Sequence, residues 1–447
     1  MSSEGVLLRN LFIETKDGEW GKDAPFPDSL EMSVIRGTDF ETVTRLELDG
    51  VPIRHIAGKA ASRKTLMPND ILIETAGGSK GKPTGKTAFL KPELFKRSPR
   101  PITCASFARF IRIDPTKAEP EFIYWYLQSM YQSREIENYQ VQHTGIARFQ
   151  FTKFADSITV QLPSIGEQRR TCEVLGSIND RMTLLSETNT TLEAVAQALF
   201  KCWFVDFDPV HAKMQGRTLE GMDEETLALF PDSFQVSELG DVPKGWQFKT
   251  MADISTVSIG KTPPRKEPQW FSEDPSDIRW ISIRDMGMQG IYASQTSEFL
   301  TKEAIQKFNV RVVPDNTVLM SFKMTIGRVA LTDGEITTNE AIAHFNLNDQ
   351  SLVTSEFIYL HLKQFDFSTL SSTSSIADAV NSKAVREIPI LVPSTEVMVA
   401  FQARIVSIFN KLKLSENQSQ NLATLRNTLL PRLISGDFHQ IEEAIVP

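Results

Sequence analysis

The sequence contains few of the residues that catalysis, metal binding or cross-linking requires. Its 447 residues include three cysteines, Cys104, Cys172 and Cys202, and an odd, scattered set of this kind argues against a disulfide framework. The six histidines lie at no metal-ligand spacing, and neither C-x-x-C nor H-E-x-x-H occurs. The Pro-Pro pair in Thr262-Pro263-Pro264-Arg265 lacks the flanking residues of an amino-methyltransferase motif. We therefore predict no catalytic residue, no metal site and no enzyme activity in this chain.

Long hydrophobic runs are also missing. No apolar stretch approaches the ~18–20 residues of a membrane helix, and the start, MSSEGVLLRNLF, lacks the features of a signal peptide. Apolar residues nevertheless make up 41% of the chain, with 28 Phe and 6 Trp, which excludes a wholly disordered chain. At about 100–200 residues per domain, the length predicts two to four domains. We expect a cytoplasmic protein with no membrane segment.

The net charge of −8 conceals two segments of opposite sign. Residues 52–117 contain 14 Lys and Arg against 4 Asp and Glu, whereas residues 164–240 contain 6 against 13. A basic segment of this kind is either an ordinary solvated face or a surface that contacts nucleic-acid phosphates. Charge alone leaves both interpretations open.

An internal repeat indicates a duplicated domain. Phe154–Ser164 and Ala384–Ser394 both alternate apolar and polar residues, reach a proline, and continue into a long helical pattern. Earlier in each copy, Glu121–Leu127 (EFIYWYL) matches Glu356–Leu362 (EFIYLHL). Because the matches keep the same order at an offset of more than 200 residues, they predict two tandem copies rather than a solenoid.

The helical pattern in each copy has apolar residues spaced by threes and fours, which is typical of a coiled-coil seam. Both seams become polar in the middle, at Asn189 and at Ser415 and Ser419. We predict that the two helices pair antiparallel, although two amphipathic helices packed separately on their own domains would give a similar pattern. A helix of about 40 residues would be ~60 Å long. The predicted pairing residues are Leu175, Ile178, Met182, Leu185, Asn189, Leu192, Leu199, Ile405, Ile408, Leu412, Leu422 and Leu429.

A loop rich in glycine and lysine follows a predicted strand near Asp70. Its spacing does not fit a Walker A motif, and Pro83 removes a backbone N–H that a phosphate cradle would use. Small side chains and lysines suit close approach to a nucleic-acid backbone, with an ordinary exposed hairpin as the alternative. The candidate DNA contacts are Lys80, Lys82 and Lys86 in this loop, Lys323, Thr325 and Arg328 in its counterpart, and Arg54, Arg148 and Arg265 elsewhere.

Three aromatic residues, Trp203, Phe204 and Phe207, stand where the first seam ends, within the acidic segment. Trp203 lies on the seam and is predicted to be buried within the chain. Phe204 and Phe207 point to other faces, so we predict that they dock a partner subunit, since buried aromatics dominate interface energetics. The alternative is that all three belong to the core.

Several stretches resemble the specificity subunits of Type I restriction–modification systems. Ala196–Val210 (AQALFKCWFVDFDPV) is similar to the central conserved region of that family, and Leu239–Trp246 (LGDVPKGW) to the entry of its second target-recognition domain. Leu425–Gly436 (LRNTLLPRLISG) is similar to the end of its distal conserved helix. Together with the repeat, the resemblance covers nearly the whole chain.

The resemblance implies an α/β (α+β) fold of two tandem target-recognition domains separated by a pseudo-two-fold pair of long antiparallel coiled-coil helices. It implies sequence-specific binding of a bipartite, asymmetric site on double-stranded DNA, with two adenine-N6 methyltransferase (modification) subunits and two restriction/translocase subunits as partners. No cofactor is expected in this chain, and S-adenosylmethionine, ATP and Mg would bind the partners. The alternative is a two-headed structural adaptor that binds proteins or RNA. The predicted divisions are 1–165 and 241–393 for the two domains, 166–208 and 394–438 for the helices, 209–240 for a linker and 439–447 for a tail.

Overall fold

The computed structural model describes residues 5–78, 83–142, 147–348, 350–370 and 380–436. The chain divides into two compact units. The first unit comprises Met1–Leu184 and Gln420–Pro447, and the second comprises Leu185–Ser419. Each unit therefore contains one globular domain together with part of each of two long helices.

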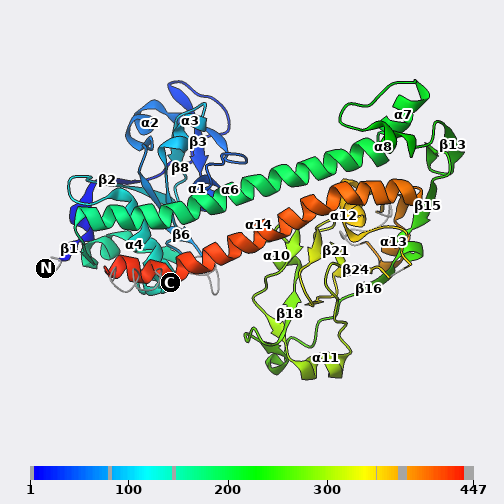
Figure 1. Ribbon diagram of the computed structural model, residues 1–447. Helices are drawn as coiled ribbons and strands as arrows, with labels where there is room; N and C mark the ends of the chain where they lie inside the picture. Colours follow the sequence, from blue (N-terminus) through cyan, green and yellow to red (C-terminus); the bar gives the residue numbers. More distant parts are fainter. Residues whose placement is uncertain (1–4, 79–82, 143–146, 349, 371–379, 437–447) are drawn as a thin grey trace. The chain divides into compact units, whose positions relative to one another are not determined.

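The first domain is built on a mixed set of short strands (Figure 1). Its central sheet has the order β2-β9-β5-β7, β4-β3-β8 and β10-β11-β6 form smaller sheets, and β1 pairs with β12. The strands are β1 (Gly5–Leu7), β2 (Phe12–Asp17), β3 (Ser29–Ile35), β4 (Ile53–Ala57), β5 (Ile71–Glu74), β6 (Ala76–Gly77), β7 (Thr87–Phe89), β8 (Ile102–Cys104), β9 (Ala108–Ile113), β10 (Gln140–Gln142), β11 (Ala147–Phe149) and β12 (Thr159–Gln161). The helices are α1 (Phe40–Thr44), α2 (Gly58–Lys64), α3 (Pro92–Arg97), α4 (Pro120–Gln132) and α5 (Phe151–Ser157).

The second domain has sheets of order β16-β24-β21-β22-β19 and β17-β20-β18-β23, and the pairs β15-β25 and β13-β14. Its strands are β13 (Phe234–Ser237), β14 (Gly240–Pro243), β15 (Gln247–Thr250), β16 (Thr256–Ile259), β17 (Phe271–Ser272), β18 (Ile278–Ile281), β19 (Tyr292–Ala293), β20 (Phe299–Leu300), β21 (Val318–Ser321), β22 (Val329–Thr332), β23 (Thr337–Thr338), β24 (Ile342–Asn346) and β25 (Pro389–Val392). The helices are α7 (Asp208–Met214), α8 (Glu224–Ala228), α9 (Met251–Ile254), α10 (Ile283–Met286), α11 (Lys302–Phe308), α12 (Ser355–Gln364) and α13 (Ser382–Arg386).

The two domains share one topology, as the sequence repeat predicts. The order β2-β9-β5-β7 in the first domain corresponds to β16-β24-β21-β22 in the second. In each domain an entry strand pairs antiparallel with the strand before the long helix, β1 with β12 and β15 with β25. The repeated EFIY sequences form α4 and α12, which lie against the central sheets. The mixed fold of two tandem domains is confirmed.

The long helices are α6 (Ile165–Phe204) and α14 (Thr395–Ser435). At 1.5 Å per residue each is about 60 Å long. Helix α6 ends at Phe204 rather than at 208, because a helical Pro209 would clash with the carbonyl of Val205; Pro209 instead lies in the first turn of α7. Among the described residues, no helix is long and apolar enough to cross a membrane.

Helix α14 continues through Pro431, which cannot donate a hydrogen bond to the carbonyl of Asn427. The side-chain amide of Gln132 on α4 donates to that carbonyl instead, at 3.0 Å. The predicted boundary at 438 lies outside the described residues, and the described helix ends at Ser435, next to Gly436 with φ +83°. A glycine suits this left-handed position after a helix.

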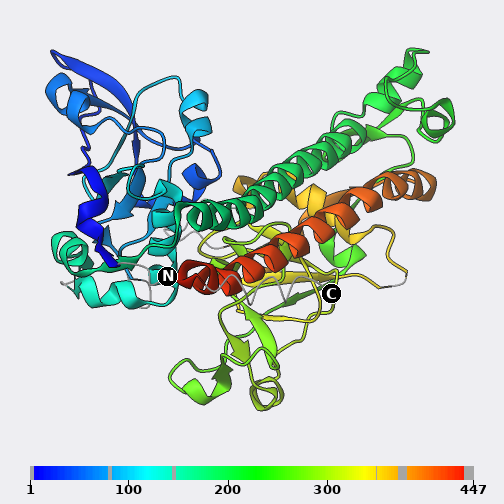
Figure 2. The same cartoon turned by 60° about the vertical axis from the view of Figure 1, so that its left-hand side comes forward.

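The long helices pair within each unit, and their direction is antiparallel. In the first unit, Leu175 near the start of α6 shares a buried cluster with Leu430 near the end of α14, and Arg426 donates to the Asn179 side chain at 2.8 Å. In the second unit, the ring centroids of Phe204 near the end of α6 and Phe401 near the start of α14 are 4.8 Å apart. Figures 1 and 2 show these parts of the helices side by side in the second unit.

The predicted pairing residues all lie away from solvent. Those that are buried are Leu175, Ile178, Leu185, Ile405 and Leu412, and those that are half-buried are Met182, Asn189, Leu192, Leu199, Ile408, Leu422 and Leu429.

Candidate nucleic-acid interface

A cation-lined cleft of about 570 Å³ lies between β2, β9 and α2 of the first domain. A neighbouring cleft of about 450 Å³ shares Asp17 and Arg109 with it. We call the first the basic cleft and the second the polar cleft. The basic cleft is lined by Thr15, Lys16, Asp17, Ala57, Lys59, Ala60, Arg63, Lys64 and Arg109, and the polar cleft by Asp17, Thr75, Arg109, Phe149, Gln150, Phe151, Thr152 and Lys153.

Helix α2 presents its cations to the basic cleft because of its residue spacing. Ala61 is buried against the domain, whereas Lys59 and Arg63, four residues apart, lie on one exposed face. Arg63 and Lys64 stand in the last turn, where positive charge interacts favourably with the helix dipole. A short helix with an alanine on its inner face thus projects basic side chains into the cleft.

The cations of the two clefts differ in how they are engaged. Arg109 donates two hydrogen bonds to Asp17, at 2.9 and 2.7 Å, and Lys64 pairs with Glu19 at 2.8 Å. The side chains of Lys59, Arg63 and Lys153 are exposed, and none of the three forms an ion pair or a hydrogen bond among the described residues. These three are available to contact an anionic ligand.

The predicted DNA contacts of the first domain differ in how far they are exposed to solvent. Lys86 is exposed, and so is Arg148 on β11, whose neighbour Phe149 lines the polar cleft. Arg54 lies over the ring of Trp20, 4.5 Å from its centroid, and pairs with an aspartate. Its side chain is 12% exposed and engaged within the domain, so the contact of Arg54 with DNA stays a prediction that these internal contacts do not favour. Lys80 and Lys82 lie outside the described residues.

In the second domain, the predicted contacts lie on the loop after β21 and near β17. Lys323 is half-exposed, and Thr325 is exposed. Arg328 donates to the carbonyl of Ile283 at 2.5 Å, so its main contact holds the loop to α10.

Arg265 is likewise occupied within the second domain. Its guanidinium donates to both carboxylate oxygens of Glu298, at 2.6 and 3.0 Å. The same group lies 4.2 Å from the ring centroid of Phe271 and 4.4 Å from that of Trp280. A bidentate ion pair on two aromatic rings gives Arg265 a structural role in this domain.

Sequence reasoning did not single out Lys59, Arg63 or Lys153. The first two lie in the basic segment 52–117, so the charge count did indicate their region. The lysines of the glycine-rich loop were predicted as DNA contacts instead, because a linear sequence does not show which cations have acidic partners.

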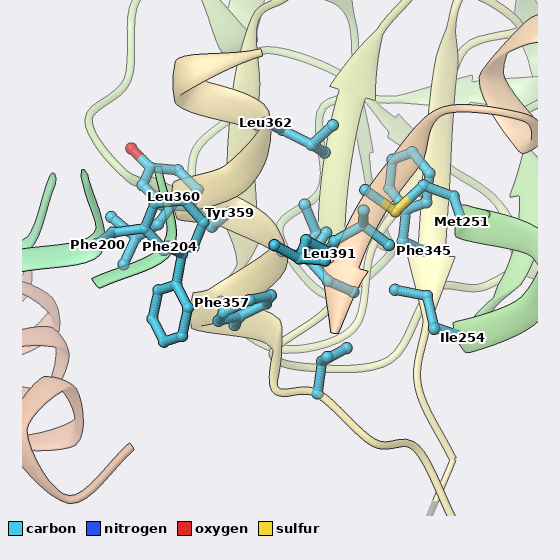
Figure 3. Close-up of a cluster of buried hydrophobic side chains, with 14 of the residues drawn as sticks. Phe200, Phe204, Met251, Ile254, Phe345, Phe357, Tyr359, Leu360, Leu362 and Leu391 are labelled. Carbon is cyan, nitrogen blue, oxygen red and sulfur yellow. The ribbon is translucent and has the colours of Figure 1, made fainter. Parts of the chain in front are cut away.

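The aromatic cluster at the end of α6 belongs to the core of the second unit (Figure 3). Trp203 is 1% exposed, as predicted. Phe204 is 6% exposed and packs edge-on against Phe357 of α12, with ring centroids 4.9 Å apart. The prediction that Phe204 docks a partner is therefore wrong, because its ring already fills an internal site. Phe207 is half-buried against Phe234 and Trp246.

The titratable groups His344, Cys104 and Cys202 are uncharged at neutral pH because burial disfavours their charged forms. His344 hydrogen-bonds Ser258 at 3.1 Å and Thr338 at 2.7 Å, and burial lowers its pKa to about 3, so the ring is neutral. Burial raises the pKa of the thiols of Cys104 and Cys202 to about 12, so both are protonated at neutral pH. Within the described ranges, no group of three or more His, Cys, Asp or Glu is placed to hold a metal ion.

Comparison with known proteins finds similarity to one class of protein. Residues 243–426 match the family model described as the Type I restriction modification DNA specificity domain. The HindI specificity subunit of Haemophilus influenzae is 29% identical over 63% of this chain and 69% of its own. The MjaIX specificity subunit of Methanocaldococcus jannaschii is 22% identical, over 95% and 88% of the two chains.

A solved structure has the same fold. The S subunit of a Type I restriction–modification system from M. genitalium matches over 96% of this chain and 95% of its own, with 14% identity and a TM-score of 0.50. This likeness shows that the tandem domains and long helices of the chain have the fold of that S subunit. Residues 243–426 therefore carry a Type I restriction modification DNA specificity domain, and the chain is similar over most of its length to specificity subunits of Type I restriction–modification systems.

Proposed function

We propose that this chain recognises a bipartite, asymmetric DNA site, with one part read by each globular domain. The observation that carries the proposal is the pair of clefts in the first domain. Lys59 and Arg63 on one face of α2, and Lys153 across the polar cleft, are placed to contact phosphates. Gln150 and Thr152 line the polar cleft with the donors and acceptors that base edges require.

This division of labour follows from DNA chemistry. Phosphate contacts position a protein on the duplex, whereas base contacts select the sequence. The clefts provide both kinds of group within one domain. A structural adaptor that binds proteins or RNA would have no need of duplex-specific contacts, and it remains the alternative.

The deciding experiment measures binding to a pool of duplex DNA with a randomised core. The full chain, alone and assembled with a methyltransferase subunit, is titrated at several salt concentrations. We expect a recovered sequence motif in two parts, and affinity that falls steeply with salt. Binding without sequence preference and without salt dependence would favour the adaptor.

We propose that the long helices set the gap between the two parts of the site. Both helices are continuous, and each contributes to both units. Inserting four residues near Leu192 should lengthen the gap and leave both recognised sequences unchanged. The same insertion between Gly216 and Gly221, which have open space around them, is the matched control and should leave the gap unchanged. A change in the recognised bases without a change in spacing would contradict the proposal.

We propose that two methyltransferase subunits and two restriction subunits dock on this chain, and that S-adenosylmethionine, ATP and Mg bind those partners. Phe204 is core, so it is not part of the docking surface, whereas half-buried Phe207 stays a candidate. Val399, Val406 and Leu414 are 64%, 39% and 51% exposed. At 100° per residue they fall on one face of α14, which supports a contact with a partner.

The double substitution V399E/L414E tests this surface. It should prevent assembly with the methyltransferase subunit while the thermal midpoint of the free chain stays the same. K411E, at an exposed position on the same helix, is the control. Normal assembly of V399E/L414E would exclude this face of α14.

A further inference from the structure

The loop between β21 and β22 carries an unusually exposed methionine. Met324 is 81% exposed, compared with 63% for Met288 and 53% for Met214. Its side chain contributes little to the packed core, because most of its surface faces solvent. Met324 therefore contributes little to the stability of the domain, and its side chain is accessible to a ligand.

The backbone at Met324 is also strained. Its φ is +62°, a value that residues with a Cβ rarely adopt. The amide of Thr325 donates to the carbonyl of Lys323 at 2.7 Å, which closes a three-residue γ-turn with Met324 at its centre. A γ-turn with positive φ is rare and strained, and glycine would relieve the strain.

Surrounding contacts hold this turn in place. The hydroxyl of buried Ser321 accepts from the amide of Arg328 at 3.0 Å and donates to the carbonyl of Thr325. The amide of Phe322 donates to Ala341 at 2.9 Å. The guanidinium of Arg328 lies so close to Gly287 that a Cβ there would come within 2.3 Å of it. Such strain persists where the surroundings over-determine it, and it gathers at ligand-binding sites.

The tip of the loop has a chemistry that suits a DNA groove. Half-exposed Lys323 and exposed Thr325 flank Met324. A lysine beside the tip can contact a phosphate, and an apolar side chain can contact base pairs or enter a base step. A strained loop that internal hydrogen bonds hold in place presents that side chain with a smaller ordering cost on binding.

We propose that Met324 is a specificity-determining residue, which contacts the base pairs of the site read by the second domain. This inference rests on the proposed function, because it assumes that the second domain binds duplex DNA. Met324 supplies an apolar contact to the bases, and Lys323 positions the loop on the backbone.

The test compares M324A, M324L and M324G in the full chain assembled with a methyltransferase subunit. The probes are a duplex selected by the wild-type protein from the randomised pool, and an unrelated duplex of equal length. M324A should weaken binding to the selected duplex by about tenfold, with little change for the unrelated duplex. M324L should retain most of the affinity. M214A, at an exposed methionine on α7, is the matched control and should bind normally.

The variant M324G distinguishes the contribution of the side chain to binding from the contribution of the loop conformation. Glycine relaxes the positive φ, so its thermal midpoint should equal or exceed that of the wild type while its affinity for the selected duplex falls. Unchanged affinity of M324A and M324G for the selected duplex would overturn the inference, as would equal losses on both duplexes. A lower thermal midpoint of M324A would also overturn it by making Met324 structural. If the wild-type protein selects no motif, the proposed function itself fails.

Discussion

The two globular domains share a sheet order but differ in the chemistry that they present. Residues 1–165 contain 22 Lys and Arg against 20 Asp and Glu, whereas residues 241–393 contain 15 against 18. The first domain has a cleft whose exposed cations Lys59 and Arg63 form no side-chain hydrogen bond or close ion pair among the described residues, and Arg63 has only a longer-range electrostatic interaction with Glu14. In the second domain Arg265 and Arg328 are held by internal contacts, and the exposed loop carries Met324.

This difference shows that a shared topology does not require a shared mode of contact. Phosphate neutralisation gives salt-dependent affinity with little sequence information, whereas apolar contacts and shape give discrimination. We therefore expect the first domain to supply more of the electrostatic affinity, and the second domain to depend more on a rigid loop.

Helix α6 contributes to the cores of both units, and Phe204→Ala in the second should have the largest effect on stability. Removing this 6%-exposed ring should lower the free energy of unfolding of the second unit by about 3–5 kcal/mol. Urea unfolding measures the loss. Val205→Ala is the control, since Val205 is 46% exposed and should change stability little. A stable Phe204→Ala protein that fails to bind a methyltransferase subunit would restore the docking role.

The charge difference can be tested with two triple variants. K59A/R63A/K153A in the first domain should reduce the slope of log affinity against log salt by about 3, because each lost phosphate contact removes about 1. K261A/R284A/K323A removes three exposed or half-exposed cations from the second domain and should reduce the slope less. Duplex binding at four salt concentrations measures both. Equal reductions would remove the proposed contrast between the domains.

The smallest expected effect is on the pH dependence of stability, and it arises where the second domain contacts α14. The Glu416 carboxylate accepts from the amides of Ile291 and Tyr292, at 2.8 and 3.2 Å. Burial raises its pKa from 4.5 to about 6, and Glu193 and Asp333 add to the effect. Lys413 is the nearby cation on the same helix, and it pairs with Asp333.

Because this pKa is higher in the folded protein, the stabilising contribution is present below pH 4.5 and is lost as the pH rises through about 6. The loss amounts to about 2 kcal/mol. E416Q should flatten stability between pH 4.5 and 7, as measured by urea unfolding. R426Q is the control: it removes the contact between α14 and Asn179 of α6 in the first unit and should leave the pH dependence unchanged. An unchanged slope in E416Q would show that another group titrates.

Much of the architecture was predictable from periodicity. The alternation before Pro163 and Pro393 predicted β12 and β25, and seven-residue spacing predicted α6 and α14. These patterns are local, because strand and helix periods are written into consecutive residues. The end of α6 was predicted less well, since the effect of Pro209 on the preceding turn was not taken into account.

The sequence by itself determined the duplication, the two long helices and the resemblance to specificity subunits, because each depends on the order and spacing of residues. Only the tertiary structure decided which cations have partners and which aromatics are buried. Arg54 and Lys59 stand close together in the basic segment, yet Arg54 lies on Trp20 whereas Lys59 lines a cleft. Phe204 lies off the predicted seam but is enclosed by α12 and α14. Ion pairs and burial join residues that are distant in sequence, so they follow from the fold and cannot be read from local patterns.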